Sequence, residues 1–163
     1  MSILPPFDTP VGRVGLTICF DVCLQLLRRA ARVLIGNQLR FPEISLAVKR
    51  QNCQIITYPS AFTVPTGRAH WDVLLRARAI ECQSYVIAAA QAGAHNSKRI
   101  SYGHSMIVSP WGEVLAQLGG EFKEPEIAIA DIDLDVVTRV RREMPLNRRT
   151  CVQAQTSAQR SKY

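Results

Sequence analysis

One cysteine stands where a thiol nucleophile could work. Cys19 lies at the end of a predicted strand, in the run GLTICFD (residues 15–21), and apolar side chains alternate before it at Val14, Leu16 and Ile18. A cysteine at the junction of a strand and a loop can expose its sulfur and receive flanking backbone N–H groups, as covalent catalysis by a thiolate requires. A lone cysteine at a strand end is more often a small core residue. Residue type alone leaves both interpretations open.

The histidines are a second source of chemistry, because imidazole is a common general base. His70 stands near the start of a predicted helix, where a capping or packing role is favoured, and His104 is expected to be a buried, hydrogen-bonded histidine. The five cysteines form no CxxC pair and have no zinc-ligand spacing with the histidines. Their odd number indicates reduced thiols in a cytosol-like compartment. We expect Cys53, Cys82 and Cys151 to be inert.

The elements that would position these side chains alternate between strands and helices. The pattern predicts strands at 14–18, 54–58, 84–90, 104–108, 113–118 and 126–133, and helices at 42–48, 68–83 and 134–143. The run Ser-Pro-Trp-Gly (109–112) suits a type I turn between two of the strands, since Pro occupies its second position and Gly its fourth. The mixture of crossovers and hairpins predicts the α/β class, as an α+β mixed sheet with helices on its outer face.

Composition limits the other classes. The chain has 163 residues, of which 47% are hydrophobic and 20% charged, as in a globular domain. No apolar run is long enough for a membrane span, and the first residues do not resemble a secretory signal. The net charge of the chain is +7. Residues 22–38 and 138–163 together carry a net charge of +9, so the rest of the chain carries −2. A basic chain raises nucleic acid as a partner, but the charge is confined to two segments, so we expect neither a nucleic-acid nor a membrane partner.

Ordered motifs change the weight given to Cys19. ICFD (18–21), RFPE (40–43), YPSAF (58–62), TGRAHW (66–71), LLRARAIE (74–81), SYGHS (101–105), PWG (110–112) and DIDL (131–134) follow one another. Together they resemble the nitrilase, or carbon–nitrogen hydrolase, superfamily. Within it they resemble the Nit branch, to which the deaminated glutathione amidases and the Nit parts of Nit-Fhit fusions belong.

The resemblance implies a fold and a chemistry. The fold of the family is an α-β-β-α sandwich, of which this chain would form the C-terminal part. Members of the family act through a Glu–Lys–Cys triad. In this triad Glu is the general base, Cys attacks the amide or nitrile carbon and Lys stabilises the oxyanion. A thioester acyl-enzyme then hydrolyses. The expected reaction is hydrolysis of a C–N amide bond in a small acidic metabolite resembling deaminated glutathione, with no metal and no organic cofactor.

Five positions match the functional residues of the family. Cys19 matches the nucleophile, and the backbone N–H of Phe20 matches the oxyanion donor. Arg40, Phe62 and Thr66 match positions that bind the acidic end of the substrate in the Nit branch. A guanidinium can bind a carboxylate with two parallel hydrogen bonds, while Phe62 would supply a wall and Thr66 a hydroxyl.

Three features depart from the family pattern. Residues 1–18 contain neither Glu nor Lys, so the upstream members of the triad are missing. An insert of seventeen residues (22–38), which includes a candidate amphipathic basic helix at 22–34, lies between Asp21 and Leu39 and so moves Arg40 away from Cys19 along the chain. The polar tail at 150–163 also diverges. We therefore expect a partial carbon–nitrogen hydrolase domain at 1–149, an N-terminally truncated form that is inactive alone.

The alternative is a non-catalytic fragment or isoform that pairs with full-length Nit subunits. The resemblance implies a homo-oligomer formed through the helix at 68–83. Arg76 and Arg78 lie on that helix, where an interface role and a solvated face are equally favoured. Trp71 and Trp111 are expected to be packing anchors.

Overall fold

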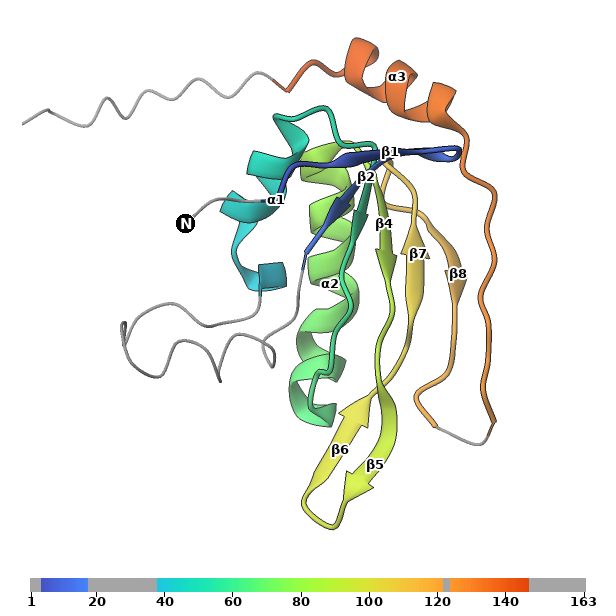
Figure 1. Cartoon of the computed structure of the whole chain (residues 1–163). Helices are drawn as coiled ribbons and strands as arrows, with labels where there is room; N and C mark the ends of the chain where they lie inside the picture. The colour runs from blue at the N-terminus through green and yellow to red at the C-terminus, as the bar shows by residue number, and fades with distance from the viewer. Residues whose placement is uncertain (1–3, 18–37, 122–123, 147–163) are drawn as a thin grey trace, which may run out of the picture.

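The computed structural model describes residues 4–17, 38–121 and 124–146. Its main feature is a six-stranded mixed sheet in the order β1-β2-β3-β4-β7-β8, with a separate two-stranded ribbon, β5-β6 (Figure 1). The strands are β1 (Phe7–Thr9), β2 (Gly12–Leu16), β3 (Ile55–Thr57), β4 (Tyr85–Ala88), β5 (Ala92–Asn96), β6 (Arg99–Tyr102), β7 (Met106–Val108) and β8 (Val114–Gln117). The helices are the 3-10 helix η1 (Gln38–Arg40), α1 (Pro42–Lys49), α2 (Val64–Cys82) and α3 (Leu134–Glu143).

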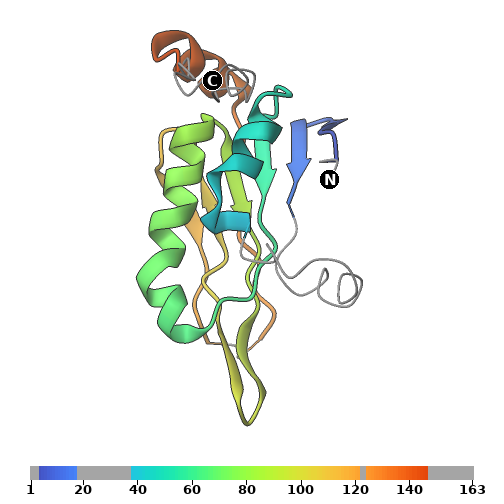
Figure 2. The same ribbon diagram turned by 90° about the vertical axis from the view of Figure 1, so that its left-hand side faces the viewer.

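Two helices cover one face of the sheet. Figure 2 shows α1 and α2 side by side on that face, with α3 at one end of the sheet. The main core lies beneath α1 and α2, where Tyr58, Trp71 and Leu75 are fully buried. α3 packs Val137 against a smaller cluster on the other face. Arg141 of α3 donates hydrogen bonds to the Gln83 carbonyl and the Ser84 hydroxyl, which tie this helix to the chain before β4.

The parallel part of the sheet determines where a site can form. β2, β3 and β4 run parallel, so their carboxyl ends meet at one edge, which is the lower end of the sheet in Figure 1. β7 and β8 continue the sheet antiparallel, and the amide of Gly112 donates to the Ser109 carbonyl in the turn between them. The predicted mixed-sheet fold class is confirmed.

One predicted strand is wrong. Residues 126–133 alternate apolar and polar side chains, yet in the part of the chain that the structure describes they pair with no strand. Ile127 and Ile129 point their side chains into solvent, with 83% and 84% exposed, and only Ile132 packs against the smaller cluster. Alternation predicts a strand only where a neighbouring edge and a covered face are both available.

Other differences concern boundaries and short elements. α2 begins at Val64, four residues before the predicted start at Arg68. Extended Thr63 occupies the N-cap position, without a capping hydrogen bond from its side chain, and Pro65 fits the first turn, where no N–H partner is needed. The short strand β1 and the polar β5-β6 ribbon were not predicted. The candidate helix at 22–34 and the tail at 150–163 lie outside the described residues.

Candidate functional site at the carboxyl edge of the parallel strands

The chain reaches the candidate site at the end of β2. Thr17 is the last described residue there, and both its amide and its hydroxyl donate to the Thr57 carbonyl, at 3.3 and 2.5 Å. Cys19 is two residues further along the chain, and both Cys19 and Phe20 lie outside the described residues. Their predicted roles therefore stay predictions, anchored to a strand end that the structure does describe.

Arg40 and Phe62 meet at this edge. Arg40 ends η1, and its guanidinium carbon lies 5.6 Å from the centroid of the Phe62 ring. Phe62 is buried and follows β3 by five residues. A cation over an aromatic face is attracted by the electrons of the ring. Two of the predicted substrate-binding residues, 22 positions apart in the chain, therefore lie together.

Several contacts hold the Phe62 ring, which forms the wall behind Arg40. The Phe62 ring packs on Trp71 of α2 with centroids 5.0 Å apart, and the Trp71 indole donates to the His104 carbonyl at 2.7 Å. The Tyr102 amide donates to the Phe62 carbonyl at 2.9 Å. The turn from 102 to 104 thus fixes both the backbone of Phe62 and the ring behind it.

His104 belongs to that support. Its ring stacks on Tyr102 with centroids 3.9 Å apart, and its Nδ1 lies 2.7 Å from the Tyr102 carbonyl. Its backbone has a φ of 61°, which a non-glycine residue adopts only when its surroundings hold it there. The expected hydrogen-bonded histidine is found, although its side chain is only half-buried. His70 is exposed in the second turn of α2, whose N-cap is Thr63, so its expected capping or packing role is wrong.

Thr66 lies on the first turn of α2. Its hydroxyl is 2.9 Å from the Thr63 hydroxyl and donates to the Thr63 carbonyl at 3.2 Å. Within the described residues, none of its hydrogen bonds reaches Arg40 or Phe62. Thr66 thus stands four residues after Phe62 in the chain, and these hydrogen bonds do not link it to Arg40.

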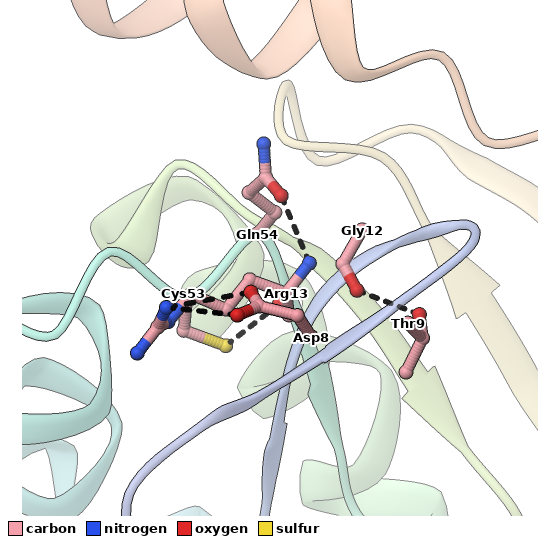
Figure 3. Close-up of polar contacts among 6 residues, drawn as sticks. All are labelled: Asp8, Thr9, Gly12, Arg13, Cys53 and Gln54. Carbon is pink, nitrogen blue, oxygen red and sulfur yellow. Dashed lines mark hydrogen bonds and ion pairs between the residues drawn. The ribbon is translucent and has the colours of Figure 1, made fainter.

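The structural thiols lie away from this edge. Cys53 donates to the Ile55 carbonyl at 2.8 Å and, more weakly, to the Arg13 carbonyl, beside the β1-β2 hairpin drawn in Figure 3. In the same view the Asp8–Arg13 ion pair and the Thr9–Gly12 and Arg13–Gln54 hydrogen bonds hold that hairpin. Cys53 and Cys82 are both buried and free, and burial raises the pKa of each thiol, in Cys82 to about 12. A protonated, buried thiol is a poor nucleophile, as expected for these two residues.

Two expectations about single side chains are wrong. Trp111, expected to be a packing anchor, is 63% exposed, whereas Trp71 is fully buried as expected. Arg78, expected at an interface or on a solvated face, is buried and paired with Glu81 at 3.0 Å.

A cavity of about 350 Å³ opens at the same end of the sheet but at another place. It lies beside the start of β5, between Ala90–Ala92 on one side and residues 118, 119, 121 and 124–126 on the other, and Arg40, Phe62 and Thr66 do not line it. Across residues 4–17, 38–121 and 124–146, no three His, Cys, Asp or Glu side chains gather to hold a metal. In the same ranges the helices are too short or too polar to cross a membrane.

Known proteins resemble the chain across most of its length. The profile of the carbon-nitrogen hydrolases matches residues 2–142. The chain is 51% identical to the probable hydrolase nit2 of Schizosaccharomyces pombe and 47% identical to the deaminated glutathione amidase of Homo sapiens. These matches cover 91% and 89% of this chain but 48% and 38% of the relatives, so the chain spans about half of their length or less.

A solved structure agrees with the sequence matches. The crystal structure of the Caenorhabditis elegans NitFhit protein superimposes with a TM-score of 0.73 at 46% identity, covering 91% of this chain and 32% of that one. The resemblance to the Nit branch is therefore confirmed. The chain belongs to the carbon–nitrogen hydrolase family.

Proposed function

We propose that this chain carries the nucleophile and the acid-binding side of a Nit-type amidase site. Its substrate would be a small amide that bears a carboxylate, of the deaminated glutathione kind named for its relatives. The observation that supports this most is the Arg40 guanidinium over Phe62, at the edge where β2 leads into Cys19. A guanidinium suits a carboxylate, which it can bind with two parallel hydrogen bonds.

The proposed reaction follows the family. The Cys19 thiolate attacks the amide carbon, the Phe20 N–H receives the developing oxyanion, and ammonia or an amine leaves as the thioester forms. Water then hydrolyses the thioester. A thiol with an ordinary pKa near ~8.5 needs a neighbouring base or cation to react at neutral pH. Residues 1–18 offer neither Glu nor Lys, so we propose that the 163-residue chain turns over little by itself.

A chimera tests this proposal. The segment of the S. pombe relative that carries the family Glu and Lys is fused before Met1, and ammonia release from succinamate is measured for the chimera and for its Cys19→Ser variant. We expect release that depends on Cys19, and only background from the 163-residue chain alone. A folded chimera that releases no ammonia, or a Cys19→Ser variant as active as the chimera, would contradict the proposal.

The alternative is that the chain acts by pairing with a second copy or with full-length Nit subunits through α2. One observation favours such pairing. Val73 and Ile80 of α2 and Trp111 of the adjoining turn are 65%, 44% and 63% exposed. Apolar side chains that gather on one surface are typical of subunit interfaces. The domain limits at 1–149, the insert at 22–38 and the tail at 150–163 also remain proposals.

A further inference from the structure

Arg78 is a buried cation on α2. Its residue surface is 4% exposed, and its Nη1 pairs with Glu81 at 3.0 Å. Its Nε is buried without a hydrogen-bond partner among the described residues. Burying a guanidinium is costly, and an apolar side chain of similar volume often replaces a buried ion at no loss of stability. The position of the charge therefore calls for a role beyond stability.

The second half of the guanidinium reaches the turn before α1. Nη2 of Arg78 donates to the Leu39 carbonyl at 2.7 Å. Leu39 is the middle residue of η1, and its side chain is buried in the main core. This residue is thus held by its side chain and by its carbonyl.

The Leu39 carbonyl belongs to the peptide unit that also carries the Arg40 amide. Because a peptide unit is planar, a donor that fixes its oxygen fixes the direction in which the next residue leaves. The next residue is Arg40, whose guanidinium lies 5.6 Å from the centroid of Phe62. A lost donor would leave a buried carbonyl unpaired, which favours rotation of the peptide unit.

We infer that Arg78 is a positioning residue for carboxylate recognition, which holds the Leu39–Arg40 peptide so that the Arg40 guanidinium stays over Phe62. The role in carboxylate recognition rests on the proposed function, whereas the placement of Arg40 does not. Arg78 touches the backbone behind the binding residue and acts through it.

A matched control lies two residues away on the same helix. Arg76 also donates to a backbone carbonyl, that of Gly112 at 2.8 Å, but in the β7-β8 turn, and its side chain is half-exposed. Arg78→Met removes the charge and keeps the volume, and Arg78→Lys keeps the charge without the two-donor fork. Arg76→Met removes an equivalent hydrogen bond that leads elsewhere.

The first measurement needs no ligand. The Nε–H resonance of Arg40 is assigned by NMR in the full chain. The same resonance in the Phe62→Leu variant gives the reference chemical shift of Arg40 in the absence of the aromatic ring. We expect Arg78→Met to move the resonance toward that position, Arg78→Lys to move it part of the way, and Arg76→Met to leave it unchanged. A resonance in folded Arg78→Met that coincides with that of the wild type would overturn the inference; if that variant does not fold, Arg78→Lys decides in the same way.

The second measurement connects the placement to binding. Dissociation constants are measured for succinamate, which bears a carboxylate, and for butyramide, which has a methyl group instead. We expect Arg78→Met to weaken succinamate binding about tenfold, since displacing a binding group by a fraction of an ångström has effects of this size, and to leave butyramide unchanged. Equal effects of Arg78→Met and Arg76→Met would refute the inference. A wild type that does not prefer succinamate refutes the proposed function instead, while the NMR result still decides the placement of Arg40.

Discussion

Two arginines of α2 that the sequence presents as alike have different environments. Arg76 and Arg78 are two residues apart, which on a helix means about 200° of rotation, so one faces solvent when the other faces the core. Arg76 is half-exposed beside Asp72 and the β7-β8 turn, while Arg78 is buried against η1. Helical spacing alone is therefore enough to separate the two environments. The partner of Arg78 could not be predicted from spacing, because Leu39 is 39 residues away.

Burial of Cys82 predicts a dependence of stability on pH. Its pKa is raised by burial to about 12 from an ordinary value of 9.0. Between pH 9 and pH 12 the folded chain keeps the Cys82 proton that the unfolded chain releases. The protonated thiol therefore contributes its full stabilisation of the fold below pH 9, and this contribution declines as the pH rises toward 12. From pH 8 to pH 10 this one thiol should lower the free energy of unfolding by roughly 1.4 kcal/mol.

Urea denaturation under reducing conditions measures this effect, with Cys82→Ala as the comparison. Both proteins lose stability as other groups titrate, and the wild type should lose the additional amount. Equal losses in the two proteins between pH 8 and pH 10 would show that Cys82 titrates normally.

At the scale of elements, the wall of the site depends on how closely α2 approaches β6. Gly67, in the first turn of α2, lies against Tyr102, and a Cβ atom at Gly67 would collide with the Tyr102 side chain. Tyr102 in turn holds the Phe62 carbonyl through its amide. A glycine at this position therefore lets α2 and the β5-β6 ribbon approach closely enough for both to hold Phe62 in place.

Gly67→Ala should destabilise the protein, even though alanine is intrinsically the better helix residue by about 1 kcal/mol. The ribbon must move away from α2, and overpacking of this kind typically costs about 1–3 kcal/mol. Urea denaturation followed by Trp71 fluorescence measures the change. Gly119→Ala is the control, since a Cβ there meets no atom within 4 Å. A Gly67→Ala protein that is more stable than the wild type, as the helix propensity of alanine alone would make it, would disprove the close approach.

Sequence pattern predicts some elements well and misses others for physical reasons. α1 and α3 begin where Pro42 and capping Asp133 indicate, and β3 and β4 lie within their predicted apolar runs. The strand expected at 126–133 fails because alternation says nothing about whether a partner edge is present. The β5-β6 ribbon is missed because it is polar and its register depends on a turn rather than on a covered face.

The candidate site is predictable only through motifs. Arg40 and Phe62 come from different elements, and nothing in their local sequence indicates that a cation lies over that ring. The order of the family motifs supplies the pairing. The support from Trp71, Tyr102 and His104 depends on backbone carbonyls and amides, which sequence patterns do not reveal.

At the scale of the whole molecule, the chain spans about half of the length of its relatives or less. The exposed apolar side chains of α2 and of the turn after β7 form one candidate interface. Isologous dimers bury the same patch from both partners, so a single charged substitution places two like charges in the interface.

Val73→Glu and Ile80→Glu should therefore convert an oligomer into monomers. Sedimentation velocity on the full chain measures this change. Ile127→Glu is the matched control, because Ile127 is equally apolar and even more exposed but lies in the segment before α3. A wild-type chain that sediments as a monomer, or a Val73→Glu chain that assembles like the wild type, would exclude pairing of two copies of this chain through α2.

The central claim is that Cys19 and Arg40 serve one site for an acidic amide. Alkylation of Cys19 by iodoacetamide, followed by mass spectrometry, tests it most directly, with buried Cys53 and Cys82 as internal references. We expect succinamate to slow labelling of Cys19 more than butyramide does, and Arg40→Met to remove that difference while leaving the slow labelling of the two buried thiols unchanged. Labelling of Cys19 that neither amide affects, or protection by succinamate that persists in full in Arg40→Met, would contradict the claim.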